Sequence, residues 1–321
     1  MKVWLDGVLR DSADTAIPCL THTLHYGTGV FEGIRSYSGP QGCFIFRLRD
    51  HLERLQASAN TLRVTMPYSI DEMEEAVQTL LRVNELGDSY IRPLVFIGEG
   101  SMSLDVRTPP GNRVRTLIAA WEWKSYFAGT PALGLSVRLG TWRRNFPHSG
   151  LNRAKAVGFY VNSYLAHADA TACGYDEAIL VDEGDHLAEA TAANIFLVRN
   201  NGLVTPTTDA ALAGITRDTM IEIARGLGFS VEERDIRPAE IFRADHVFLT
   251  GTACEVVPVA KVNGQPIGND AGAQVVRDLA ALYQRAVRND YTPSRKPASS
   301  DWCTPHLRSS TETRNGIVSN A

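Results

Sequence analysis

The sequence is poor in lysine and cysteine and has no long apolar run. Lys and Arg together number 32 among 321 residues, but only five of these are lysines. The five cysteines are scattered and form no CxxC pair, so neither a zinc site nor a disulfide framework is predicted. Free thiols in a reducing cytoplasm are expected instead. No stretch of about 18 uncharged apolar residues occurs, so no membrane-spanning helix is expected.

The charge balance excludes further classes of protein. Asp and Glu number 36, which gives a formal net charge of -4. Binding to nucleic acid or to a membrane surface needs a concentrated excess of positive charge, which this sequence lacks. The charges of Asp6, Arg10, Asp11 and Asp14 interrupt any apolar core of a signal peptide. With 44% hydrophobic and 21% charged residues, the composition is that of a soluble globular protein, and the length suggests two domains.

Residues 1–123 are expected to form a small N-terminal domain that mixes strands and helices. The pair Asp6-Gly7 predicts a tight hairpin turn between two short strands. A helix is expected where Leu52, Leu55, Ala59 and Leu62 recur at spacings of three and four. A second helix should begin at the capping box of Ser69 and Glu72. Further strands are expected at Phe44–Leu48, Tyr90–Ile97 and Thr116–Trp123.

A larger second domain is expected over residues 135–290, after a linker at 124–134. A helix is expected over Ala154–Cys173, with one apolar face made by Val157, Val161, Tyr164, Leu165 and Ala168. The other expected helices are Thr216–Leu227 and Gln274–Val287. Strands are expected at Leu135–Thr141, Ala178–Val181, Asn194–Val198 and Val247–Thr250. Hairpin turns are predicted at Asn201-Gly202 and Asn263-Gly264. Residues 291–321 are rich in Ser, Thr, Pro and Arg without any period, so a disordered tail is expected there.

Three local patterns could carry chemistry. Lys155 lies among small and apolar residues, where loss of hydration favours a neutral, nucleophilic amine, although a lysine can also extend to solvent from a helix start. Glu189 lies among alanines and needs a buried cationic partner unless it sits on an exposed loop. Gly214 precedes a predicted helix whose free N–H groups suit a phosphate, but a plain Thr N-cap gives the same pattern.

In order and combination, five segments resemble the branched-chain amino-acid aminotransferases, enzymes of fold type IV that use pyridoxal 5'-phosphate (PLP). The segments are Leu24–Arg35, Tyr90–Pro93, Lys155–Tyr160, Gly214–Asp218 and Gly251–Glu255, and the resemblance spans roughly residues 1–288. It implies an α+β fold with a small N-terminal α/β domain and a larger C-terminal barrel-like α/β domain, with PLP between them. It also implies at least a homodimer, because the partner subunit completes such sites.

The resemblance implies a role for each matching residue. Lys155 matches the catalytic lysine that holds PLP as a Schiff base, Tyr160 the tyrosine at its phenolic oxygen, and Glu189 the carboxylate that faces a protonated ring nitrogen. The residues that match the phosphate site are Arg54, Ile215, Thr216 and Thr252. The residues that match the substrate site are Tyr26, Phe31, Tyr90, Arg92, Trp123, Tyr126, Thr252 and Ala253.

The implied reaction is transamination between L-branched-chain amino acids and 2-oxoglutarate, which yields 2-oxo acids and L-glutamate. Within this site, Arg92 and Tyr26 resemble the residues that accommodate the second carboxylate of glutamate. Several alternatives stay open at this point: transamination of D-amino acids or R-amines, an aminodeoxychorismate lyase, or a non-catalytic relative. The expected partners are small amino acids and 2-oxo acids, without nucleic acid, membrane or metal.

Overall fold

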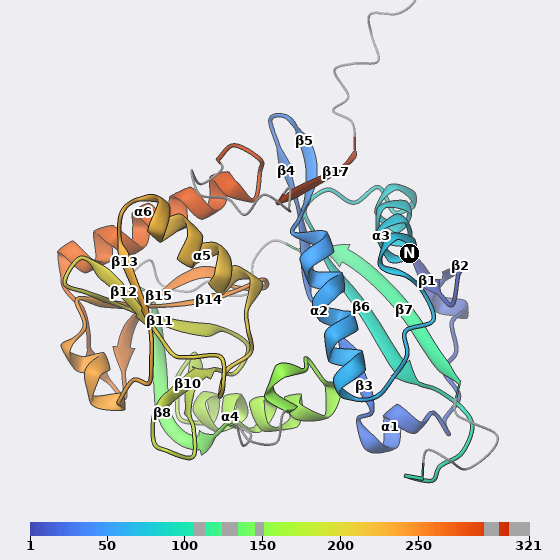
Figure 1. Cartoon of the computed structure of the whole chain (residues 1–321), viewed down its shortest axis with the longest axis horizontal. Helices are drawn as coiled ribbons and strands as arrows, with labels where there is room; N and C mark the ends of the chain where they lie inside the picture. Colours follow the sequence, from blue (N-terminus) through green and yellow to red (C-terminus); the bar gives the residue numbers. More distant parts are fainter. Residues whose placement is uncertain (106–112, 124–133, 145–150, 292–301, 308–321) are drawn as a thin grey trace, which may run out of the picture.

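Two β-sheets with their helices form the two halves of the molecule (Figure 1). The structure is a computed structural model that describes residues 1–105, 113–123, 134–144, 151–291 and 302–307. In this part of the chain no helix is both long and apolar enough to cross a membrane. The expected linker at 124–134 lies, except for its last residue, outside the described residues, so the domain boundaries stay a prediction.

The first sheet has the strand order β17-β5-β4-β6-β7-β1-β2, with β3 paired to β6, and its pairings are antiparallel. Its strands are β1 Lys2–Leu5, β2 Val8–Asp11, β3 Gly29–Phe31, β4 Ile34–Gly39, β5 Gly42–Phe46, β6 Ser89–Ile97, β7 Val114–Glu122 and β17 Cys303–Leu307. The helices of this half are α1 His22–Tyr26, α2 Leu48–Thr61 and α3 Ile70–Val83.

Local sequence signals explain much of this half. The Asp6-Gly7 turn joins β1 and β2 as predicted. Helix α2 buries Leu52 and Leu55 against the sheet. The capping box that starts α3 is formed, since the side chains and backbone of Ser69 and Glu72 bond reciprocally.

The second sheet has the order β10-β9-β8-β15-β14-β11-β12-β13, with β16 paired to β15. It is mixed, because β8 runs parallel to β9 and β15, and β12 runs parallel to β13. Its strands are β8 Leu135–Arg143, β9 Glu177–Val181, β10 Leu187–Ala190, β11 Asn194–Arg199, β12 Gly202–Thr205, β13 Ser230–Glu233, β14 His246–Gly251, β15 Glu255–Val262 and β16 Gln265–Pro266. The helices are α4 Tyr160–Ala172, α5 Ile215–Gly226 and α6 Asp270–Ala286.

The start and the buried face of α4 differ from the expectation. The helix begins at Tyr160 rather than Ala154, because residues before it lie against the first half: Ala156 bridges Val30, and Gly158 donates to the Gly27 carbonyl. The predicted apolar face is mostly exposed, whereas the small residues Ser163, Ala166 and Ala170 are buried.

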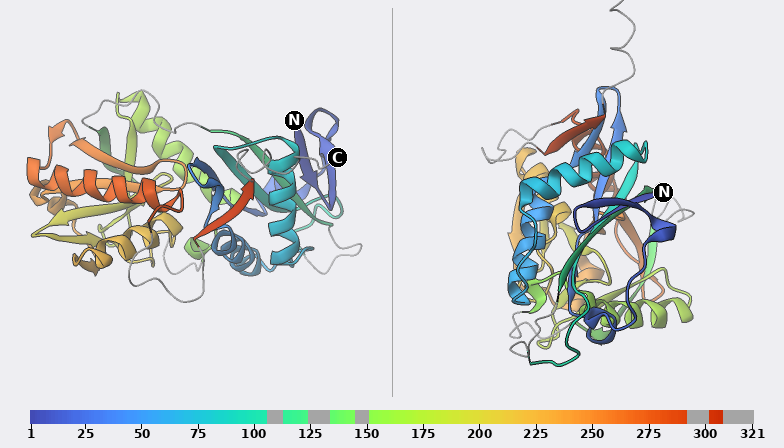
Figure 2. Two further views of the ribbon diagram at one scale, coloured as in Figure 1. Left: turned by 90° about the horizontal axis from the view of Figure 1, so that it is seen from above. Right: turned by 90° about the vertical axis from the view of Figure 1, so that its right-hand side faces the viewer.

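The expected disordered tail contains a strand. Strand β17 pairs antiparallel with β5 at the edge of the first sheet, and Trp302 before it is buried. Seen from above, β17 lies between the two halves of the molecule (Figure 2). For residues 302–307 the expectation of disorder is therefore wrong; the rest of the tail beyond Tyr291 lies outside the described residues.

Candidate active site

Both halves of the molecule contribute to one cavity of about 730 Å³. It is lined by eleven of the residues that the sequence analysis assigned to the site: Phe31, Arg54, Tyr90, Arg92, Lys155, Tyr160, Glu189, Ile215, Thr216, Thr252 and Ala253. Phe31, Arg54, Tyr90 and Arg92 come from β3, α2 and β6 on one side, and Lys155 and Tyr160 come from the segment before α4 and from its start. The others come from β10, the start of α5 and the turn after β14. The chain therefore brings together groups that are far apart in sequence.

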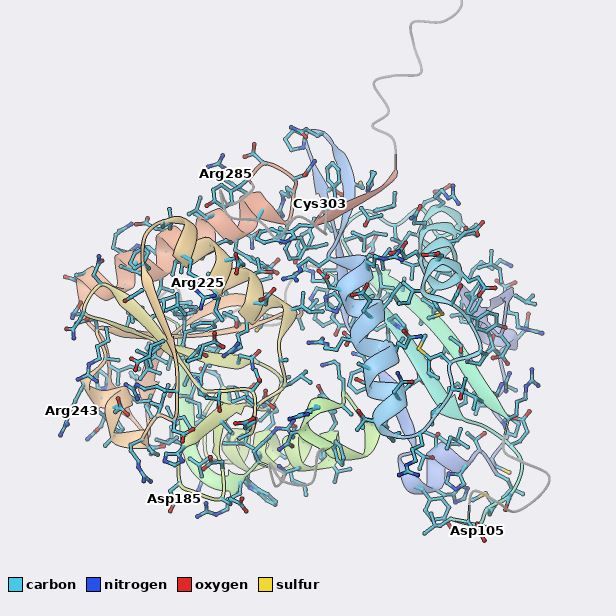
Figure 3. All side chains as sticks on the ribbon, in the orientation of Figure 1. Asp105, Asp185, Arg225, Arg243, Arg285 and Cys303 are labelled. Carbon is cyan, nitrogen blue, oxygen red and sulfur yellow. The ribbon has the colours of Figure 1, made fainter. Side chains whose placement is uncertain are left out.

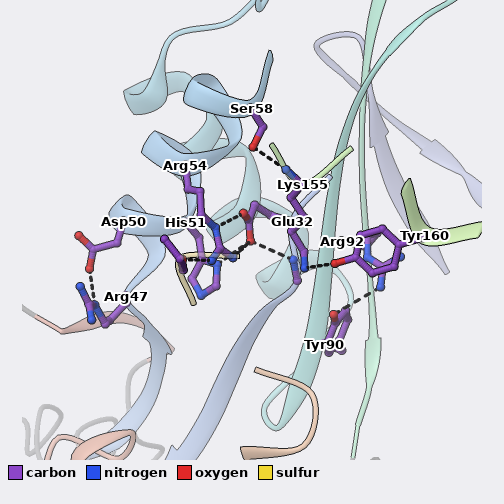
Figure 4. A network of polar contacts seen from close by, with 12 residues as sticks. Glu32, Arg47, Asp50, His51, Arg54, Ser58, Tyr90, Arg92, Lys155 and Tyr160 are labelled. Carbon is purple, nitrogen blue, oxygen red and sulfur yellow. Dashed lines mark hydrogen bonds and ion pairs between the residues drawn. The ribbon is translucent and has the colours of Figure 1, made fainter. Parts of the chain in front are cut away.

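Lys155 lies in the extended segment between the two halves, just before α4. Its backbone N–H donates to Ser58 Oγ at 3.0 Å, and its carbonyl accepts from the Phe31 N–H at 3.0 Å. The amine Nζ lies 2.7 Å from Tyr160 Oη and 5.0 Å from the centre of the Phe31 ring (Figure 4). Two backbone anchors thus fix the lysine while its amine points into the cavity, so the alternative of a lysine extending to solvent is not realised.

Glu189 is buried on β10, and it already has a cationic partner within the chain. Arg144, directly after β8, donates from Nε to Glu189 Oε1 at 2.6 Å, and both side chains are less than a tenth exposed. The other oxygen, Oε2, accepts from the Leu212 N–H at 3.1 Å and from Asn194 Nδ2 at 3.3 Å. The sequence reasoning missed Arg144, since an ion pair between residues 45 positions apart leaves no local signal.

Arg54 is held by a buried carboxylate. Glu32, which is fully buried, accepts from Arg54 Nε at 2.7 Å and from Nη2 at 2.9 Å, and His51 Nδ1 lies 2.7 Å from the same carboxylate (Figure 4). Burial opposes ionisation of Glu32, but the Arg54 charge and His51 hold its pKa well below the ordinary value. Burial lowers the pKa of His51 despite Glu32, so the ring is neutral at pH 7 and donates through Nδ1–H.

The start of α5 offers unsatisfied backbone donors beside Arg54. Its N-cap, Gly214, gives no side-chain hydrogen bond to the first turn, whose N–H groups therefore stay available. A Cβ on Gly214 would lie 1.9 Å from Asn194 Oδ1, so only glycine fits at this position. Arg54 Nη1 donates to the Ala213 carbonyl at 2.8 Å, which fixes the loop before the helix. Donors of this kind bind anions.

Aromatic rings and one guanidinium form the wall on the β6 side. Arg92 Cζ lies 4.7 Å from the centre of the Phe31 ring and 5.3 Å from that of Tyr90. Its Nη2 is 3.4 Å from Tyr90 Oη, and no carboxylate in the described part of the chain pairs with it. A Cβ on Gly33 would overlap the Tyr90 hydroxyl at 1.9 Å, so the glycine leaves room for that ring.

Two of the predicted substrate residues, Tyr26 and Trp123, do not line this cavity. Tyr26 is about half exposed on α1 and donates to the Met102 carbonyl at 3.1 Å. Trp123 packs its ring 5.0 Å from that of Tyr90, behind the wall. Tyr126 lies outside the described residues.

Comparison with known proteins agrees with this geometry. The sequence model of class IV amino-transferases matches residues 29–262. A branched-chain-amino-acid aminotransferase of Pseudomonas aeruginosa is 40% identical over 304 residues, covering 94% of this chain and 96% of its own. The branched-chain amino acid aminotransferase of T.th., complexed with N-(5'-phosphopyridoxyl)-L-glutamate, has a TM-score of 0.87 at 36% identity, covering 95% of this chain and 98% of that chain. Complexed with 4-methylvaleric acid, it has a TM-score of 0.85 at the same identity and coverage.

The fold is α+β, and one cavity is lined by a lysine, a paired carboxylate and a helix N-terminus. Together with the likeness to solved structures, this identifies an enzyme of fold type IV, as the resemblance predicted. The chain belongs to the class IV aminotransferases, and it is an aminotransferase.

Proposed function

We propose that this aminotransferase moves the amino group of L-leucine, L-isoleucine or L-valine to 2-oxoglutarate, which yields 2-oxo acids and L-glutamate. The observation that carries the proposal is the wall of Phe31, Tyr90 and Arg92. Of the three arginines that line the cavity, Arg54 and Arg144 bind carboxylates of the chain, whereas Arg92 has no such partner among the described residues. An apolar wall with one uncommitted guanidinium suits both an aliphatic side chain and a second carboxylate.

The cofactor is pyridoxal 5'-phosphate, which supplies a ring that acts as an electron sink for transamination. The residues present fit it. The free N–H groups of Ile215 and Thr216, with Arg54 and Thr252, suit its phosphate. Thr250 Oγ1, buried and lining the cavity, has no hydrogen-bond partner among the described residues, so a polar atom is left for a ligand.

Lys155, Tyr160 and Glu189 are assigned the chemical roles. Lys155 would hold the cofactor through Nζ, and the same amine would move the proton at the substrate α-carbon. Tyr160 Oη lies 2.7 Å from that amine and would form a hydrogen bond with the phenolic oxygen of the cofactor ring. Glu189 would hold the proton on the ring nitrogen of the cofactor, and its hydrogen bonds to Arg144, Asn194 and Leu212 keep its carboxylate oriented.

Substrate binding is assigned to the opposite wall. The Tyr90 hydroxyl and the backbone at Thr252 and Ala253 hold the α-carboxylate, and Phe31 packs against the substrate side chain. Arg92 binds the second carboxylate when the substrate is glutamate or 2-oxoglutarate. The relative solved in two complexes supports this dual use, since one complex holds a glutamate conjugate and the other 4-methylvaleric acid, a branched apolar acid.

A homodimer is part of the proposal. Leu24 lines the cavity yet is 66% exposed, and Tyr26 lies outside the cavity of its own chain. On α4, Tyr164 is 72% exposed beside the exposed Val161 and Leu165. We assign to a second copy both the covering of these apolar side chains and the supply of its Tyr26 to the substrate pocket. The five free cysteines support a reducing compartment, the cytoplasm.

A panel of amino donors tests the function. The holoenzyme is mixed with one amino acid at a time, and its absorption spectrum follows conversion from the pyridoxal to the pyridoxamine form. L-leucine, L-isoleucine, L-valine and L-glutamate should all convert it, and D-amino acids and R-amines should not. Rapid conversion by a D-amino acid but not by L-leucine would contradict the proposal.

Light scattering after gel filtration tests the dimer. Tyr164→Glu places a charge on the exposed face of α4 and should shift the protein towards the monomer. Leu227→Glu, at an exposed position after α5, is the control and should leave the dimer intact. A Tyr164→Glu variant that stays dimeric at the same concentration would place the interface elsewhere.

A further inference from the structure

The C-terminal strand contacts both halves of the molecule. Strand β17 pairs with β5 of the first sheet, with Cys303 opposite Phe46 and Thr304 opposite Ile45. Cys303 Sγ donates to the carbonyl of Ala286 at the end of α6, which belongs to the second half. Figure 3 shows Cys303 at this junction. Trp302, just before the strand, is buried in the same core cluster as residues of α5 and α6.

Trp302 supports Arg47, the N-cap residue of α2. The Trp302 carbonyl accepts from the Arg47 N–H at 2.5 Å, and the Trp302 ring lies 5.8 Å from Arg47 Cζ. The Arg47 backbone lies in the left-handed region, with a φ angle of 51°. A residue with a side chain adopts this strained conformation only where surrounding contacts stabilise it. The strand edge therefore stabilises both the backbone and the side chain of this arginine.

Arg47 in turn binds the first turn of α5 across the junction. Its Nη1 donates to Asp218 Oδ2 at 2.6 Å, to Thr219 Oγ1 at 3.1 Å and to the Ile215 carbonyl at 3.3 Å. Arg54 follows seven residues later, two turns along the same face of α2, and binds the Ala213 carbonyl. Arg47 and Arg54 thus fix the segment from Ala213 to Thr219, which contains the free N–H groups at the start of α5.

We propose that Trp302 and β17 are positioning elements for the phosphate site of the cofactor, acting through Arg47. The proposal rests on the function above, which assigns Ile215 and Thr216 to that phosphate. A shift of Arg47 would release the first turn of α5, while Lys155, which is held by Ser58 and Phe31, and Glu189, which is held by Arg144, would keep their places. Loss of the strand should therefore weaken binding of the phosphate and spare binding of the ring.

Two ligands separate these effects. Apoenzyme is titrated with PLP and with pyridoxal, which has the same ring but no phosphate. Trp302→Ala should raise the dissociation constant for PLP about tenfold or more, on the scale seen for residues that orient a binding group, and leave that for pyridoxal within about twofold. Arg47→Lys, which leaves the core around Trp302 filled, should give the same selective loss.

Truncations provide a matched pair. Deletion of residues 308–321 leaves β17 in place and should bind PLP like the full chain, whereas deletion of 302–321 should reproduce the Trp302→Ala loss. Ile215→Pro, at the first helical position of α5 where proline is tolerated, removes one of the assigned N–H groups and should also weaken PLP selectively. If it does not discriminate PLP from pyridoxal, the phosphate assignment is wrong. If that variant does weaken PLP selectively, but the Trp302 and Arg47 variants weaken binding of PLP and pyridoxal equally, or of neither, the positioning role is overturned.

Discussion

Removing one partner of the Arg144–Glu189 ion pair should destabilise the enzyme before any cofactor binds. The two side chains meet at 2.6 Å and are both buried, so Arg144→Met leaves a buried carboxylate without its cation. Breaking a buried pair in this way costs about 3–5 kcal/mol. The N–H groups of Leu212 and Asn194 still bind Glu189 Oε2, so we expect the lower end, about 3 kcal/mol.

A double-mutant cycle isolates the pair. Glu189→Gln alone leaves Arg144 uncompensated and should cost a similar amount, while the double variant removes both charges. Urea unfolding of the four apoproteins should show that the double variant loses about 2 kcal/mol less than the sum of the single variants. Additivity within about 0.5 kcal/mol would refute the reasoning, because it would mean that the two groups do not act as a unit.

The same variants test how the ion pair serves the cofactor. PLP should stabilise Arg144→Met more than it stabilises the wild type, since a protonated ring nitrogen would replace the missing cation at Glu189. Glu189→Gln should bind PLP but lose on the order of 10²-fold in kcat, which is about 2.7 kcal/mol. Wild-type turnover in Glu189→Gln would mean that this carboxylate does not face the ring.

Three further predictions concern other residues of the site. Borohydride reduction should fix the cofactor to the peptide that contains Lys155, and Lys155→Ala should lose nearly all turnover; an adduct found by mass spectrometry on another lysine would reject the assignment. Arg92→Leu should slow the half-reaction with glutamate more than that with leucine, by on the order of 2 kcal/mol, whereas an equal loss would limit Arg92 to ordering the wall. Burial lowers the pKa of His51 below its unfolded value of 6.5, so in acid the unfolded chain binds more protons than the folded chain does. The free energy of unfolding therefore decreases as the pH falls below 6.5. His51→Asn should make the fall of the urea midpoint between about pH 7.5 and 5 shallower without abolishing it, because burial also lowers the pKa of His306, to about 4. A slope as steep as that of the wild type would contradict the assignment, and this window lies above the unfolded pKa of Glu32.

Sequence reasoning succeeded where the physical cause is local. The capping box of Ser69 and Glu72 and the hairpin at Asp6-Gly7 involve neighbouring residues, so their signals are complete within a few positions. The resemblance to one family also predicted eleven of the residues that line the cavity, because residues in a shared motif keep their places on a shared fold. Lys155 and Glu189 also stand out locally, because each lies among small residues.

It failed where distant parts of the chain decide. Arg144 has no signal, since its partner lies on another strand. On α4 the small side chains of Ser163, Ala166 and Ala170 are buried, which leaves the larger apolar side chains such as Tyr164 outside. Trp302 looked like an isolated apolar residue of a tail because the edge of β5 that receives it was not visible in the sequence.

The pairing of the arginines explains how one pocket can serve two kinds of side chain. Arg54 and Arg144 are each balanced by a carboxylate of the chain, so the net positive charge they add to the cavity is small. Arg92 has no carboxylate partner in the described part of the chain and its Nε is buried without a hydrogen bond, and burying a cation without an anion is costly. The faces of Phe31 and Tyr90, at 4.7 Å and 5.3 Å, reduce that cost by cation–π attraction. With the proposed substrates, the guanidinium would therefore stay in place without an anion while leucine is bound, and it would form an ion pair when glutamate replaces leucine.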